Sequence, residues 1–174
     1  MSNKIFIGID PGPKYTGVVV RQGEEVLHAS TYVRPKDMLP ITWAVTVTNL
    51  VLKDVIAKYP EAKVGIEGVT VPNAYNGGKL AMINPKSTIH LGIVVGAFAF
   101  ALPDAVIVRP GKNGSQPVYP ACLSGRRPSE LAGTNAGAGT RNHEKSAYDV
   151  AGLAEGLHND RYKLDEQQNL FDLA

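Results

Sequence analysis

Three acidic residues lie at positions where a carboxylate needs a positive partner. Asp10 ends the apolar run 4–10 directly before a Pro-Gly turn, Glu67 ends the apolar run 62–67, and Asp149 lies in an Ala-rich segment of helical character. A carboxylate at the end of a buried strand loses hydration, and a metal ion or a phosphate-bound cation can offset that cost. Acids from two strands and a late helix can converge on Mg²⁺, which prefers oxygen ligands.

The periodicity of the apolar residues predicts the elements that must position these acids. The expected strands are 4–10, 16–21, 25–32, 62–67 and 105–109, and the expected helices are 41–58, 85–102 and 143–157. The first three strands have short links and therefore form an antiparallel meander. The order β-β-β-α-β-α-β-α predicts an α/β fold with a mixed five-stranded sheet and helices on both faces. Strands one and four would be neighbours, which places Asp10 beside Glu67, with Asp149 opposite them.

Length and composition bound the class of protein. A chain of 174 residues fits one domain with a real core, which we expect over residues 1–158, followed by a polar tail over 159–174. Cys122 is the only cysteine, which excludes an intrachain disulfide and a Cys-based zinc site. No signal-peptide pattern and no run long enough to span a membrane is present, so we expect a cytoplasmic protein.

The distribution of charge says more than the net charge of +2. Five basic residues fall between positions 112 and 145, where acids are sparse: Lys112, Arg126, Arg127, Arg141 and Lys145. A basic region ahead of Asp149 suits a phosphate-rich partner. An ordinary solvated surface is the alternative.

Four short motifs follow one another in an order that a known family shares. They are Asp10-Pro11-Gly12 followed by Thr16-Gly17, then Ile66-Glu67-x-Val69, then Leu91-Gly92-x-x-x-Gly96, and finally Asp149-Val150-Ala151-Gly152-Leu153-Ala154. Together they resemble the ribonuclease H-like superfamily, and within it the RuvC Holliday-junction resolvases. The similarity covers residues 4–109 and 143–157 and fails in 110–140. The short length and divergent middle look more like the small phage-encoded members, which act inside a bacterial host cell.

This resemblance implies Mg²⁺- or Mn²⁺-dependent hydrolysis of phosphodiesters with two ions per active site. Two ions roughly 4 Å apart can activate a water and stabilise the leaving oxygen in one in-line step. By analogy with the family, Asp10 would bridge both ions. Glu67 would hold the ion near the leaving group, and Asp149 would hold the one that carries the attacking water.

One position departs from the family pattern. RuvC enzymes usually carry an Asp or His three residues before the last Asp, and here that residue is Ser146. His143 lies one helical step further back, but at 3.6 residues per turn it is rotated roughly 120° from Asp149. His143 can act as a ligand or move a proton. Glu144 is a second candidate, and neither residue is the third alternative.

The loops beside these acids are candidates for contacts with DNA. The resemblance implies an aromatic probe after the second acid, and Tyr75 and Asn76 occupy that loop. Stacking on a base or wedging of an opened pair would suit them. Phosphate contacts are expected from basic residues of the first turn, of this loop and of the segment 110–141: Lys14, Lys79, Lys86, Arg126, Arg127 and Arg141. Ordinary surface loops are the alternative.

Two partners besides branched DNA are expected. A four-way junction is two-fold symmetric, so a homodimer would place two active sites on it, and the apolar helix with Gly92 and Gly96 offers a surface for that contact. The tail sequence with Gln167, Leu170 and Phe171 looks like the Gln-x-x-Leu-Phe peptide that binds the bacterial sliding clamp. A tail that packs on its own domain is the alternative.

Other functions compete with that of a junction endonuclease. A nuclease of the same fold that cuts flaps or RNA has the same acids, because loops and dimer geometry select the substrate. Asp10-x-Gly12 with Gly17 also looks like the phosphate loop of actin-like ATPases, but the chain is too short for their two domains. A junction-binding protein without catalysis is the third class, and Ser146 favours it.

Overall fold

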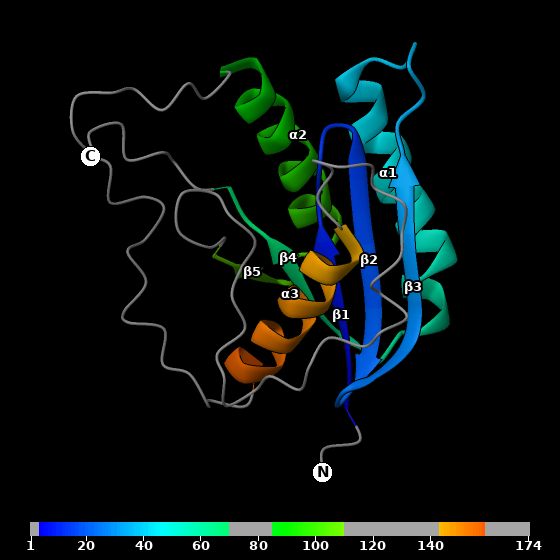
Figure 1. Ribbon diagram of the computed structural model, residues 1–174, viewed down its shortest axis with the longest axis vertical. Helices are drawn as coiled ribbons and strands as arrows, with labels where there is room; N and C mark the ends of the chain where they lie inside the picture. Colours follow the sequence, from blue (N-terminus) through cyan, green and yellow to red (C-terminus); the bar gives the residue numbers. More distant parts are fainter. Residues whose placement is uncertain (1–3, 70–84, 110–142, 159–174) are drawn as a thin grey trace, which may run out of the picture.

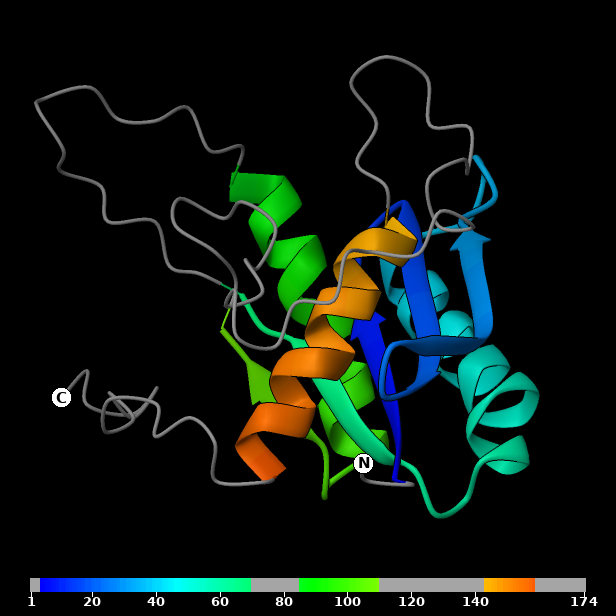
Figure 2. The ribbon, with the colours of Figure 1, turned by 60° about the horizontal axis from the view of Figure 1, so that its bottom comes forward.

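The computed structural model describes residues 4–69, 85–109 and 143–158. A five-stranded sheet in the order β3-β2-β1-β4-β5 has α1 and α2 on one face and α3 on the other (Figures 1 and 2). The strands are β1 (Ile5–Asp10), β2 (Tyr15–Gln22), β3 (Glu25–Val33), β4 (Lys63–Glu67) and β5 (Val106–Val108). The helices are α1 (Pro40–Asp54), the short 3₁₀ helix η1 (Ile56–Lys58), α2 (Pro85–Ala101) and α3 (His143–His158).

The pairing of the strands confirms the predicted mixed sheet. β1, β2 and β3 form an antiparallel meander, in which Asp10 of β1 lies opposite Gly17 of β2. β4 runs parallel to β1, with Ile9 beside Ile66, and β5 runs parallel to β4. Because β4 and β5 are parallel, α2 must run antiparallel to them. It therefore begins at the edge where β1 and β4 end.

The larger core lies between the sheet and the layer of α1 and α2. Side chains alternate between the two faces of a strand, so one set from each strand points to this layer. The fully buried members of this core are Ile7, Ile9, Val18, Val20 and Ile66 from the sheet, Val47 and Val51 from α1, Val55 directly after α1, and Val94 and Phe98 from α2. Each large apolar side chain buried in this way contributes roughly 1.5–3 kcal/mol to folding.

Glycines on the opposite face let α3 lie close to the sheet. A Cβ atom at Gly8 of β1 would collide with the backbone carbonyl of Ala147, and one at Gly65 of β4 would lie 2.7 Å from the Cβ of Ala154. Helix and strand backbones can therefore approach only if these positions lack a side chain. Because side chains alternate along a strand, the residues two positions after Gly8 and Gly65 also face α3. These residues are Asp10 and Glu67.

The predicted boundaries differ from the observed ones mainly around residue 55. We expected one helix over 41–58, whereas α1 ends at Asp54 and η1 follows. The backbone of Val55 leaves the helical region with φ −121° and ψ −61°, and its side chain is fully buried in the core. Packing of this β-branched residue competes with helix continuation there. No helix in the described ranges is long and apolar enough to cross a membrane.

Candidate active site

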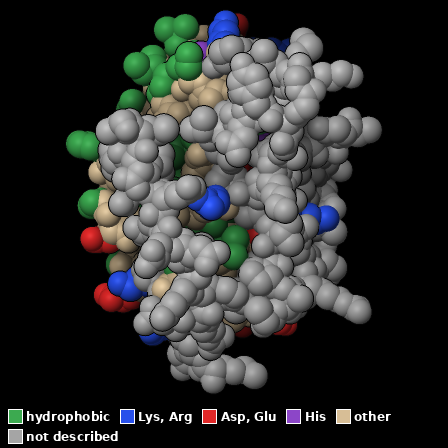
Figure 3. Space-filling view, turned by 90° about the vertical axis from the view of Figure 1, so that its left-hand side faces the viewer, with side chains coloured by type: hydrophobic (Ala, Val, Ile, Leu, Met, Phe, Trp, Pro, Cys, Tyr) green, Lys and Arg blue, Asp and Glu red, His purple; other side chains and the backbone are tan. Residues whose placement is uncertain are grey.

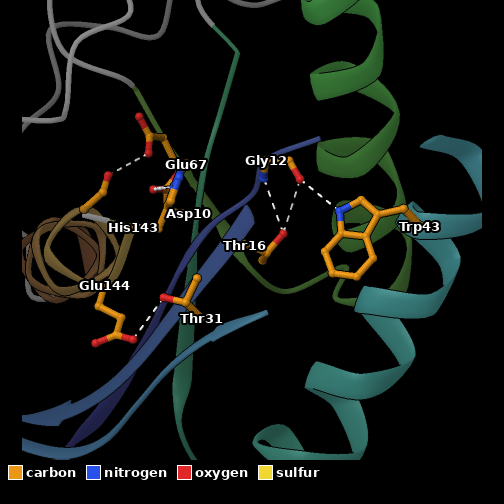
Figure 4. Close-up of polar contacts among 9 residues, drawn as sticks. Asp10, Gly12, Thr16, Thr31, Trp43, Glu67, His143 and Glu144 are labelled. Carbon is orange, nitrogen blue, oxygen red and sulfur yellow. Dashed lines mark hydrogen bonds and ion pairs between the residues drawn. The ribbon is translucent and has the colours of Figure 1, made fainter. Parts of the chain in front are cut away.

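The sheet places Asp10 and Glu67 side by side. Both end parallel neighbouring strands, one position beyond the register pair Ile9 and Ile66, and both side chains belong to the face that α3 covers (Figure 4). Asp10 is 8% exposed and Glu67 is 7% exposed. Two nearly buried carboxylates on one edge create a local demand for positive charge.

The turn after Asp10 is anchored to α1. The indole N–H of Trp43 donates a 3.0 Å hydrogen bond to the carbonyl oxygen of Gly12, and the backbone N–H of Gly12 lies 3.4 Å from the hydroxyl of Thr16 (Figure 4). A Cβ at Gly12 would collide with the carbonyl of Tyr15. These contacts close the turn tightly and hold the end of β1 in place.

His143 contacts Asp10 directly. Its Nδ1 atom lies 2.8 Å from Oδ2 of Asp10, and because the carboxylate can only accept, Nδ1 carries the proton. His143 is the first residue of α3, and its backbone carbonyl lies against Gly17, the register partner of Asp10. The missing side chain at Gly17 therefore brings the start of α3 within reach of Asp10. The imidazole also stacks on Tyr15, with ring centroids 5.5 Å apart and planes at 29°.

Ser146 makes the corresponding contact to Glu67. Its hydroxyl donates a 2.9 Å hydrogen bond to Oε2 of Glu67, and Ser146 is only 4% exposed. His143 and Ser146 are three residues apart and thus neighbours on one side of the helix. One side of the first turn of α3 therefore contacts both strand-end acids.

Asp149 and Glu144 are two further acids of the same helix. Asp149 is one turn beyond Ser146 and is 1% exposed. Glu144 is 5% exposed and accepts a 2.9 Å hydrogen bond from the hydroxyl of Thr31 on β3, so its carboxylate points away from the two strand-end acids (Figure 4). In the ranges that the structure describes, no three His, Cys, Asp or Glu side chains form a group arranged to hold a metal ion. The described contacts thus join Asp10 to His143 and Glu67 to Ser146, and Asp149 is buried one turn further along α3.

Two of the predicted DNA contacts can be placed. Lys14 is exposed in the turn after β1, with its Nζ atom 5.1 Å from the centroid of the Tyr15 ring. Lys86 is exposed in the first turn of α2, at the sheet edge where β1 and β4 end. The other predicted contacts lie outside the described residues: Tyr75, Asn76, Lys79, Arg126, Arg127 and Arg141, as do Gln167, Leu170 and Phe171 of the tail.

Sequence reasoning missed the supporting residues of this site. Tyr15, Thr31 and Trp43 belong to no motif, and Ser146 stands out in the sequence only as a departure from one. Strand alternation is the signal that finds Tyr15, because it shares the face of Gly17 two residues on. Trp43 and Thr31 carry no such signal, because their partners are distant in sequence.

These elements and this topology define a ribonuclease H-like fold, as comparison with solved structures shows. The structure of Thermus thermophilus RuvC in complex with a Holliday-junction substrate matches with a TM-score of 0.57 at 17% identity, over 91% of this chain and 96% of that chain. A second Thermus thermophilus RuvC structure matches with a TM-score of 0.51 at 17% identity, over 90% and 96%. Neither a protein-family model nor a curated protein sequence matches the chain.

Proposed function

We propose that this protein is a metal-dependent endonuclease that nicks branched DNA, and that its preferred substrate is the Holliday junction. The observation that carries the proposal is the pair of nearly buried carboxylates, Asp10 and Glu67, at the ends of neighbouring parallel strands, with His143 bonded to Asp10. The fold shared with the junction-bound RuvC structure supports the choice of substrate.

The donor chemistry of the site fits Mg²⁺ or Mn²⁺. Carboxylate oxygens are the ligands that these hard ions prefer, and two nearly buried carboxylates on one edge gain from a divalent cation. Asp10 and Glu67 would hold the metal, and Asp149 would complete the set from α3. When bound, a pair of ions supplies an activated water and neutralises charge on the leaving oxygen.

His143 is the residue placed to handle a proton. Asp10 accepts from Nδ1, so in the neutral imidazole the lone pair of Nε2 can accept a proton from water or bind a metal ion. A carboxylate behind the ring fixes the tautomer. Lys14 and Lys86 lie at the same edge of the sheet and suit phosphates of the DNA backbone, together with the predicted contacts of the two long loops.

The outer face of α2 supports a homodimer. Ile89 is 63% exposed and Phe100 is 91% exposed, and no atom lies within 4 Å of a Cβ built at Gly92 or Gly96. Figure 3 shows hydrophobic side chains along the left edge, on the side of α1 and α2. Glycines that meet nothing in the monomer cost helix stability, and a second helix packed against them would explain their presence.

The dimer has its own test. Phe100→Glu should yield a monomer by sedimentation at micromolar concentration, whereas Ile41→Glu on the exposed side of α1 should leave the mass unchanged. A wild-type monomer under these conditions would refute the dimer. The proposed docking of Gln167, Leu170 and Phe171 on a sliding clamp is tested separately, and unchanged clamp binding after Leu170→Ala/Phe171→Ala would reject it.

Cleavage of a labelled four-way junction tests the activity. With Mg²⁺ or Mn²⁺ we expect paired symmetric nicks, reduced at least about 1,000-fold in Asp10→Asn and Glu67→Gln. Asp104→Asn is the matched control, because Asp104 is exposed in the turn before β5 at the opposite edge of the sheet. Flap, Y-shaped, linear and RNA-containing duplexes run beside it, and equal cutting of these would indicate a general nuclease instead.

A junction-binding protein without catalysis is the second candidate. Ser146, a neutral residue, contacts Glu67 at the position where the resemblance places an Asp or His. Tight junction binding without cleavage in either metal, with no Mn²⁺ bound in calorimetry, would establish this candidate and reject the nuclease.

A further inference from the structure

Tyr15 stacks its ring on the imidazole of His143. It is the first residue of β2 and shares the face of Gly17, against which the start of α3 lies. The resulting stack has a centroid separation of 5.5 Å, within the 4.5–7 Å range of favourable aromatic pairs. Neither the strand-end acids nor the resemblance to RuvC pointed to this residue.

The imidazole of His143 needs a second constraint to have one orientation. Its hydrogen bond to Asp10 fixes one atom of the ring, about which the ring plane can still turn. His143 is also the first residue of α3, so no earlier turn of that helix packs against its side chain. The stack on Tyr15 fixes the plane, and with it the direction in which Nε2 points.

Tyr15 itself is held on a rigid segment. The neighbouring turn is closed by the bonds of Gly12 to Trp43 and Thr16. The carbonyl of Lys14 accepts a 2.9 Å hydrogen bond from the N–H of Arg34. The backbone on both sides of Tyr15 is therefore held by the sheet and by α1. The ring itself contacts the imidazole of His143, and the Lys14 ammonium 5.1 Å from the ring centroid adds a cation–π contact.

We propose that Tyr15 is a positioning residue that orients the imidazole of His143 toward the reacting phosphate, at the sheet edge where β1 and β4 end. This role rests on the proposed nuclease function. Stacking needs an aromatic ring and not a hydroxyl. Tyr15→Phe therefore keeps the orientation, whereas Tyr15→Leu loses it while filling a similar space. A misplaced proton-handling group costs rate and not substrate affinity, because it acts in the transition state.

The test compares kcat and junction affinity. Tyr15→Leu should lower kcat by about 10-fold to 100-fold and leave Kd for the junction within about threefold, and Tyr15→Phe should restore kcat. In a His143→Ala background, Tyr15→Leu should have no further effect, because the two residues act as one unit. Equal losses in both backgrounds, or wild-type kcat in Tyr15→Leu, would overturn the proposal while leaving the nuclease function intact.

A spectroscopic measurement separates failure of this proposal from failure of the nuclease function. At one fixed pH, the ring ¹⁵N signals of His143, assigned by their loss in His143→Ala, report the tautomer and the bond to Asp10 and are little affected by the ring current of a neighbouring aromatic side chain. They should shift in Tyr15→Leu and stay near their wild-type positions in Tyr15→Phe. This result supports the orienting contact even if no variant cleaves DNA. Unshifted His143 signals in Tyr15→Leu would refute it, whatever the cleavage assay shows.

Discussion

The hydroxyl of Ser146 donates a 2.9 Å hydrogen bond to Oε2 of Glu67 and so joins α3 to the end of β4. Both residues are buried, at 4% and 7% exposure. A neutral donor satisfies one carboxylate oxygen without adding charge, whereas an acid at the same place would add one. With serine at position 146 the site therefore has one negative charge fewer than with an acid, and this difference should change its affinity for metal ions.

Ser146→Asp should bind Mn²⁺ more tightly than the wild type. A further carboxylate beside Glu67 increases the charge offered to the cation, and we expect an affinity several-fold to about tenfold higher by calorimetry. Without metal the same variant should unfold at lower urea concentration, because like charges then repel. Ser146→Ala, which removes only the hydrogen bond, should lose about 1 kcal/mol of unfolding free energy. Unchanged Mn²⁺ affinity in Ser146→Asp would show that residue 146 does not face the ion.

Gly8→Ala should destabilise the protein strongly. A Cβ at this position would collide with the carbonyl of Ala147, so α3 must shift away from β1, and we expect a loss of about 3 kcal/mol in urea unfolding. Gly92→Ala is the control, since its Cβ would meet no atom within 4 Å, and it should be neutral or raise stability by up to about 1 kcal/mol at concentrations that keep the chain monomeric. Equal effects of the two substitutions would contradict the close approach of α3 to the sheet.

Trp43→Phe should impair the site from the far side of the sheet. The variant keeps most of the buried ring but loses the N–H that donates to Gly12, and we expect about 1–2 kcal/mol of destabilisation. Because this bond anchors the turn after Asp10, cleavage should also fall by more than the fraction of unfolded protein explains. Activity measured well below the melting temperature checks this. Full activity in a measurably destabilised variant would show that the turn does not depend on the bond.

Much of the architecture could be predicted because it follows from local rules. Short turns force the first three strands into a meander, and β4 and β5, which α2 joins, become parallel neighbours. The pairing of β4 with β1, which brings Asp10 and Glu67 to one edge, joins strands that are distant in sequence, and it is the order of the elements that predicts it. The alternation of side chains then decides which face carries the two acids.

The details of the site depend on how α3 docks, which no local rule specifies. Helical geometry predicts only that His143 and Asp149 point in different directions from the helix. The contact of His143 with Asp10 arises because Gly17 has no side chain, so that the start of α3 can lie against β2 beside Asp10. Likewise, the sequence makes Glu144 a candidate metal ligand, whereas in the structure its carboxylate accepts a hydrogen bond from Thr31 of β3. Such contacts between distant segments depend on the depth and rotation of one helix over three strands.

His28 should make stability depend on pH in the mildly acidic range. Burial lowers the pKa of His28 below its usual 6.5, and Lys58 acts in the same direction, while Glu144 and Asp54 act against it. The folded protein thus favours neutral His28, whereas the unfolded chain takes up a proton as the pH falls below about 6.5. The contribution of His28 is therefore complete above that pH and is lost as the pH falls from 6.5 toward the lower pKa of the folded state.

Urea unfolding at several pH values between 5 and 8 checks this expectation. His28→Gln keeps a polar side chain beside Ser30, whose hydroxyl lies 3.1 Å from Nε2 of His28, but it cannot titrate. The free energy of unfolding of the wild type should decline more steeply on acidification than that of the variant, and the two should differ by a constant amount above pH 7. The other histidines are the same in both proteins, so their contributions cancel in the comparison. Parallel curves across the whole range would show that His28 has the same pKa folded and unfolded.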